Sequence, residues 1–162
     1  MVPRADRFLA GQFRKKGPRA MTLIKWSARH RIGVKALDEQ HATFAAILNE
    51  FHAAMLQGEG KGAADALLPR LASYVRQHLQ AEEAMMEAAQ YPELMQHREL
   101  HREFAHELEA FAARHDKGDD GVYVELLRFL YSAHYTHALE ADREYGSWLG
   151  QHGSCEKVFS RT

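Results

Sequence analysis

Four segments of the chain have the three-and-four-residue apolar spacing of an amphipathic helix, and each has histidine within its apolar stripe. Residues four apart on a helix share one face, so polar residues at this spacing point the same way as their apolar neighbours. The stripes are therefore expected to direct these polar side chains into one interior: His41 in the first segment, His78 and Glu82 in the second, His97 and His101 in the third, and His134 and His137 in the fourth.

Clear helix breakers separate the four segments. They are QGEGKG at 57–62, QYPE at 90–93 and KGDDG at 117–121, and Gly150 and Gly153 follow the last segment. Pro92 suits the first turn of the third helix, and short connections between long helices favour antiparallel neighbours. The sequence predicts an all-α, up-down-up-down four-helix bundle over residues 21–153, preceded by an N-terminal extended segment and followed by a tail at 154–162.

Residues 1–20 form a basic leader with a net charge of +5, which leaves −6 for the rest of the chain. The leader has no helical period, so a disordered extension, with an in-frame start at Met21, is expected; a targeting or anionic-surface segment is the alternative. Because Trp26 leads into the first helix, we expect it to dock on the bundle. Deleting 1–20 is expected to leave stability nearly unchanged.

Composition and charge limit the partners and the cellular compartment that can be expected. An acidic body is a poor electrostatic match for nucleic acid, so no nucleic-acid partner is expected. The apolar runs fall short of the roughly 20 residues that span a bilayer, and Cys155 has no second cysteine to pair with. We expect a cytoplasmic protein without membrane insertion, either a monomer or a weak homo-oligomer.

The inward-facing polar residues predict a bound cation. A buried polar group without a partner costs about 2–7 kcal/mol, and an unpaired carboxylate costs more. A metal ion satisfies several such groups together, and its binding energy adds to the energy of folding. Five other histidines are not expected to bind a metal, because they lie off the stripes, in flanking segments or at a helix end: His30, His52, His106, His115 and His152.

The motifs around these residues resemble bacterial hemerythrin, a non-haem di-iron family that binds oxygen. The resemblance runs from about Trp26 to about Trp148, in the family's order. The matching stretches are IGVKALDEQH ending at His41, HLQAE with His78 and Glu82, HRELH with His97 and His101, and HALEAD with His137 and Asp142.

The resemblance implies a role for each of these residues. His97, His101 and His137 would bind one iron, His41 and His78 the other, and Glu82 and Asp142 would bridge the two. His137 and Asp142 are five residues apart, about 140 degrees around an ideal helix. Bridging, or a local widening of the helical turn, would have to accommodate that spacing.

Counting ligands then suggests a function. If both irons take six ligands, five histidines, two bridging carboxylates and one bridging oxygen leave one open position, on the iron with two histidines. The family resemblance implies reversible dioxygen binding there, for storage, delivery or sensing, by a protein that is not an enzyme. The alternatives are a di-iron enzyme that reduces peroxide or nitric oxide, and a metal-storage bundle.

The expected oxygen pocket departs from the family. It comprises Phe44, Leu79, Ala133, His134 and Ala138. The family usually has tryptophan, leucine and isoleucine at the last three positions. Either His134 only hydrogen-bonds inside a roomier bundle, or it makes a polar pocket that can donate a proton to bound oxygen. The second interpretation predicts faster autoxidation as pH falls through the range where histidine titrates.

Overall fold

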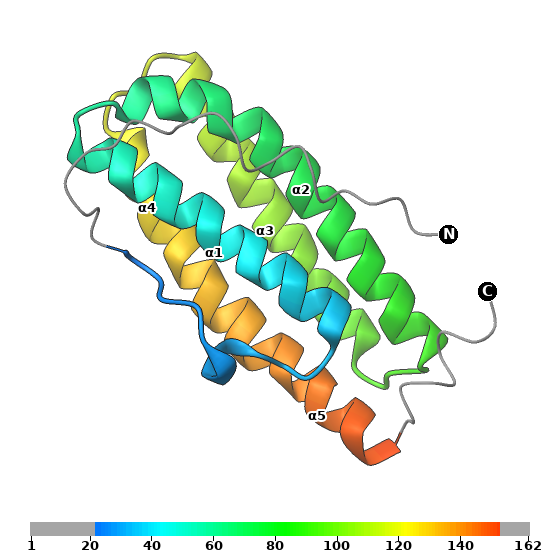
Figure 1. The fold of residues 1–162 in the computed structure, drawn as a ribbon. Helices are drawn as coiled ribbons and strands as arrows, with labels where there is room; N and C mark the ends of the chain where they lie inside the picture. Colours follow the sequence, from blue (N-terminus) through cyan, green and yellow to red (C-terminus); the bar gives the residue numbers. More distant parts are fainter. Residues whose placement is uncertain (1–21, 153–162) are drawn as a thin grey trace.

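The computed structural model describes residues 22–152 and has the predicted all-α, four-helix architecture (Figure 1). The leader at 1–20, the tail at 154–162 and Gly153 lie outside the described residues. Three long helices are followed by a fourth that is continuous but changes its winding. The elements are α1 (Lys35–Leu56), α2 (Gly60–Ala88), α3 (Leu94–Asp116), α4 (Val122–Ala133), the π-helical η2 (His134–Ala141) and α5 (Asp142–His152).

Three helix boundaries differ from the sequence prediction. Helix α2 begins at Gly60, inside the expected breaker; Gly60 packs closely, since a Cβ there would lie 2.5 Å from the Met55 sulfur. Helix α5 continues through Gly150, where glycine costs about 1 kcal/mol relative to alanine without ending the helix. Pro92 lies in the turn before α3 rather than in its first turn.

The buried apolar residues form two clusters, with the predicted polar residues between them along every helix. On α1, Leu37 belongs to the smaller cluster and Phe44 to the larger, and His41 lies between them. On the fourth helix, Leu130 and Tyr145 enclose the polar residues in the same way. Apolar layers on both sides keep the polar layer away from solvent.

Residues 22–34, here called the N-terminal strap, run along the outside of α1 and the fourth helix and include the short 3-10 turn η1 (Ala28–His30) (Figure 1). The Asn49 side chain holds both backbone groups of Ile24, accepting from its N–H at 2.8 Å and donating to its carbonyl at 2.9 Å. Trp26 packs against the larger apolar cluster, which confirms that it docks on the bundle.

The other end of the strap is tied to α1 and α5. The Ile32 N–H donates to Asp38 Oδ1 at 2.7 Å, and Arg143 donates to the Arg29 carbonyl at 2.6 Å. Gly146 of α5 packs so closely that a Cβ there would lie 2.2 Å from the Ile32 carbonyl oxygen. The strap is therefore a fixed outer wall of the bundle.

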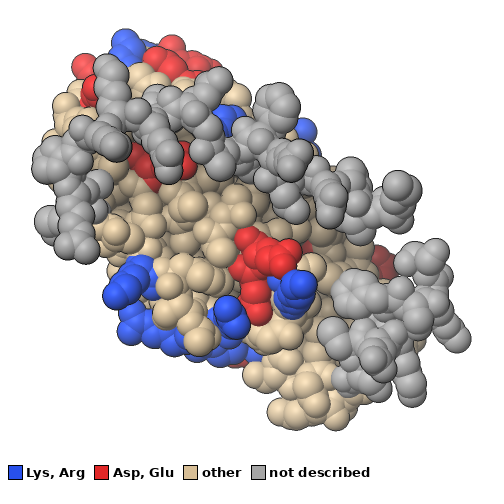
Figure 2. Space-filling view, viewed as in Figure 1, with Lys and Arg blue, Asp and Glu red and all other residues tan. Residues whose placement is uncertain are grey.

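On the face that Figure 2 shows, basic side chains gather along the lower left edge, a group of acidic side chains lies beside them, and most of the other described surface is uncharged. Within residues 22–152, none of the helices is both long enough and apolar enough to cross a membrane.

Candidate metal centre

The structure brings all seven predicted ligand residues together in the polar layer between the apolar clusters. Their donor atoms form two groups, within each of which the atoms lie within 4.8 Å of one another. One group contains Glu82, His97, His101 and His137, and the other contains His41, His78 and Asp142. Six of the seven side chains are buried, and His137 is half-buried. The division into three and two histidines is the one that the family resemblance implies.

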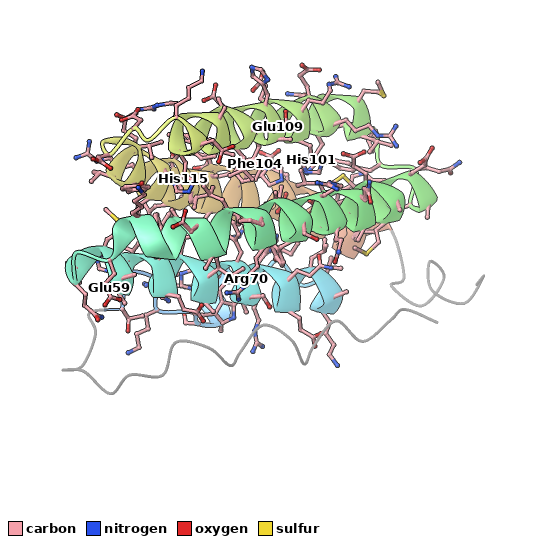
Figure 3. All side chains as sticks on the ribbon, turned by 90° about the horizontal axis from the view of Figure 1, so that it is seen from above. Glu59, Arg70, His101, Phe104, Glu109 and His115 are labelled. Carbon is pink, nitrogen blue, oxygen red and sulfur yellow. The ribbon has the colours of Figure 1, made fainter. Side chains whose placement is uncertain are left out.

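In the first group, imidazole nitrogens face one another across a short gap. His101 Nε2 lies 2.9 Å from His137 Nε2. Nitrogens on adjacent positions of one six-coordinate ion, each about 2.1 Å from it, would lie about 3 Å apart. Figure 3 shows His101 on the inward side of α3, as its burial requires. The spacing suits two ligands of a single ion.

The two carboxylates lie between the groups. Asp142 Oδ1 is 3.3 Å from both His97 Nε2 and His137 Nε2, whereas its other oxygen, Oδ2, is 2.9 Å from His41 Nε2. Glu82 Oε2 is 3.3 Å from His101 Nε2 and 4.0 Å from His78 Nε2. Each carboxylate therefore lies within 4.0 Å of histidines from both groups, and Asp142 does so through a different oxygen for each group, as a bridging ligand would.

A change of helix type brings His137 and Asp142, which are five residues apart, onto the same face of the fourth helix. Residues His134–Ala141 form a π-helix, in which each turn contains more residues than in an α-helix. Five residues then span little more than one turn, so both side chains point into the bundle. This confirms the expected local widening. Single-turn π-segments inside α-helices are frequent at functional sites.

The contacts among these groups are electrostatically favourable but poorly directed. Burial by itself would raise the pKa of the Glu82 carboxyl, yet contacts with His101, His137 and His97 hold it well below its usual value. Burial opposes protonation of His97, but Asp142 and Glu82 raise its pKa to about 9. Ionised carboxylates beside imidazoles attract a cation strongly.

Several donor atoms of the layer have hydrogen-bonding capacity to spare. Among the described residues, both oxygens of Glu82, both oxygens of Asp142 and the Nε2 atoms of His41 and His97 lack a partner with hydrogen-bond geometry, although imidazole nitrogens and carboxylate oxygens lie within 4 Å of one another. Lone pairs that converge without facing a donor suit a common ion. The residues present therefore fit a metal, and the mixture of imidazole and carboxylate suits iron as well as zinc.

Two further side chains orient the histidines from outside, and sequence reasoning missed both. The Nδ1 atom of His78 lies 2.6 Å from Gln40 Oε1, and the Nδ1 atom of His101 lies 2.7 Å from Glu83 Oε1. An N–H at Nδ1 leaves Nε2 free to bind a metal, and such partners commonly fix the ligand's orientation. Arg98 in turn donates to Glu83 at 3.1 Å. The only indication of these two residues in the sequence was that Gln40 precedes His41 and Glu83 follows Glu82.

The residues of the expected oxygen pocket differ in their surroundings. His134 and Phe44 are buried with ring centroids 6.2 Å apart, and Ala138 is buried one turn along η2. Leu79 belongs to the same apolar cluster as Phe44 and also lines a groove of about 270 Å³ between α2 and α3, beside His101. Ala133 is half-buried at the end of α4.

Two further histidines lie buried beside the site. His30 was expected not to bind a metal, and it belongs to neither group of donor atoms, but it is only 2% exposed and its ring lies 6.1 Å from that of His134. Its position before the first helix concealed this, because the strap folds back over the bundle. Burial, with the charges of His41 and His30, lowers the pKa of His134 to about 4. His134 is therefore a neutral group over the ordinary histidine range.

Comparisons with known proteins agree with this geometry. A family model described as "Hemerythrin HHE cation binding domain" matches residues 32–149. A bacteriohemerythrin from Ralstonia nicotianae is 30% identical over 133 residues, covering 82% of this chain and 93% of its own. Bacteriohemerythrins from Stenotrophomonas maltophilia and Pseudomonas aeruginosa are 26% and 24% identical, covering 82% and 81% of this chain and 85% and 95% of their own.

Proposed function

The chain belongs to the hemerythrin family, and on that premise we propose that it holds two iron ions in its polar layer and binds dioxygen reversibly. Storage, delivery or sensing of oxygen would be its role. The observation that supports this best is the unequal division of donors: three imidazoles with Glu82 in one group, and two imidazoles with Asp142 in the other. An ion held by the second group would have a position left for an external ligand.

The protein's own residues have four tasks in this proposal. Glu82 and Asp142 would bind the ions and neutralise part of their charge. Glu83 and Gln40 orient two of the imidazoles. The apolar clusters on both sides limit the entry of water. When bound, the iron pair would supply two electrons and the open position for oxygen.

Metal analysis and an aerobic spectrum of the purified protein test this proposal. Two irons per chain and a visible absorption band that is lost under vacuum are expected. The isosteric changes Glu82→Gln and Asp142→Asn should each remove much of the iron, because one bridging charge is lost and neighbouring imidazoles lose their partner. Glu87→Gln, at an exposed position on α2, is the matched control. Full retention of two irons in both bridge variants would refute the bridging roles.

A colourless protein that contains zinc would instead favour a storage or structural bundle. One observation favours the enzymatic alternative, namely the polar His134 beside the site. Steady-state consumption of hydrogen peroxide with a supplied reductant tests it. Turnover well above that of free iron, and lower in His134→Leu, would assign the chain to peroxide reduction.

A further inference from the structure

His134 is a buried imidazole whose hydrogen-bonding capacity is unused. Its side chain is 1% exposed, and within residues 22–152 neither ring nitrogen has a hydrogen-bond partner. An imidazole always has at least one N–H to donate, and a buried donor without an acceptor costs free energy. A leucine of similar size would avoid that cost. A bound ligand that accepts a hydrogen bond from His134 would remove that cost.

Aromatic rings surround His134 on several sides. The ring centroids of Trp26 and His30 lie 6.1 Å from that of His134, and the ring of Phe44 lies at 6.2 Å. Two of these rings belong to the strap, where the Ser27 N–H donates to His30 Nδ1 at 3.1 Å and fixes the His30 ring. These neighbours enclose His134 without accepting from it.

His134 lies near the donor group that has only two histidines. His41 and Asp142, both members of that group, are close enough for their charges to affect the pKa of His134. Phe44, whose ring faces His134, lies one helical turn after His41 on α1. His134 therefore lies on the side of the polar layer where an external ligand is proposed to bind.

We propose that His134 determines which external ligands this site prefers, by donating a hydrogen bond to small anionic ligands bound on the His41 and His78 side. The inference rests on the proposed function, since a metal must hold the other end of the ligand. Linear or bent anions of two or three atoms, such as azide and hydroperoxide, have the charge and the terminal acceptor atom that this donor requires. A hydrogen bond to a charged acceptor is among the stronger ones.

Azide titration of the iron-loaded, oxidised protein tests the proposal. His134→Leu is expected to raise the azide Kd by roughly 10-fold or more, because a hydrogen bond to a charged group is lost. His134→Gln retains an N–H donor and should bind within about threefold of the parent. His106→Leu, at an exposed position on α3, is the matched control and should leave the Kd unchanged.

Two measurements do not depend on the variants binding azide. In the parent, the infrared stretch of bound azide should shift between H₂O and D₂O, because the donated hydrogen exchanges. In the metal-free chain, His134→Leu should raise the melting temperature, because an unpaired buried polar group is removed, whereas a structural histidine would give the opposite result.

The failures of the two proposals are distinguishable. Equal azide affinity of the parent and His134→Leu at full iron content, or an azide stretch that is insensitive to D₂O, would overturn the role of His134 and leave the iron site intact. A parent protein that takes up no iron would overturn the proposed function, and this inference with it.

Discussion

Gly146→Ala is expected to destabilise the protein although it replaces glycine with a better helix former. Gly146 lies inside α5, where alanine is favoured by about 1 kcal/mol in the absence of other contacts. A Cβ at this position, however, would lie 2.2 Å from the Ile32 carbonyl oxygen and 3.3 Å from the Ile32 Cβ. The substitution therefore forces the strap away from α5.

The magnitude follows from how little the strap can move. An ordinary contact of this kind needs more than 3 Å, so the backbone would have to shift by roughly 1 Å. The strap is held on both sides of Ile32, by the bond of its own N–H to Asp38 and by the bond of Arg143 to the Arg29 carbonyl. Overpacking typically costs about 1–3 kcal/mol, and a clash with a backbone held on both sides should cost about 2–3 kcal/mol. Subtracting the gain of about 1 kcal/mol in helix propensity leaves a net loss of about 1–2 kcal/mol.

Gly150→Ala is the matched control, because it lies in the same helix and a Cβ there would contact nothing within 4 Å. It should stabilise the protein by about 0.5 kcal/mol. Urea unfolding of both variants measures the difference, which should reach about 2 kcal/mol and separate their melting temperatures by roughly 4–8 °C. If Gly146→Ala is as stable as Gly150→Ala, the tight contact between the strap and α5 is wrong.

Three further predictions concern the metal centre. Glu83→Gln should weaken metal affinity by roughly 10–100-fold, because the residue orients His101, whereas Glu87→Gln, which also pairs with Arg98, should not; competition with a chelator measures both, and equal affinities would exclude the orienting role. Removing the metal should lower the melting temperature by roughly 10 °C or more, because the metal binds only the folded chain; a scan before and after chelation shows this. The metal-free chain should be most stable near pH 6.5. As pH falls toward 4, histidine in the unfolded chain takes up a proton that native His78, with its pKa of about 4, does not, so the free energy of unfolding falls. As pH rises through 9, native His97 loses the proton that its pKa of about 9 had retained, so this stabilisation is lost. Urea midpoints from pH 4 to 9 test this, and a flat profile would contradict it.

The sequence by itself determined the fold class and the chemistry of the polar layer. Apolar stripes at helical spacing can bury themselves only against one another, so four such stripes with short connections specify a bundle. Histidine at His41, His78, His97 and His101 lies on those stripes, and the helical period alone places each of them inward. Local periodicity is sufficient here because an α-helix repeats without reference to the rest of the chain.

Periodicity failed where the answer depended on packing between distant segments. The sequence left the spacing of His137 and Asp142 open, and the π-helix that resolves it depends on the contacts of the folded bundle. Glu83 became a partner of His101 only through the packing of α2 against α3.

The N-terminal strap shows the same limit most clearly. Residues 22–34 have no helical period that would reveal an inward face, so His30 could not be recognised as buried from the sequence. Its position is decided by tertiary hydrogen bonds such as the one from Arg143 to the Arg29 carbonyl, which joins residues far apart in the chain. Contacts at that separation depend on how the chain folds back on itself, and only the tertiary structure contains that information.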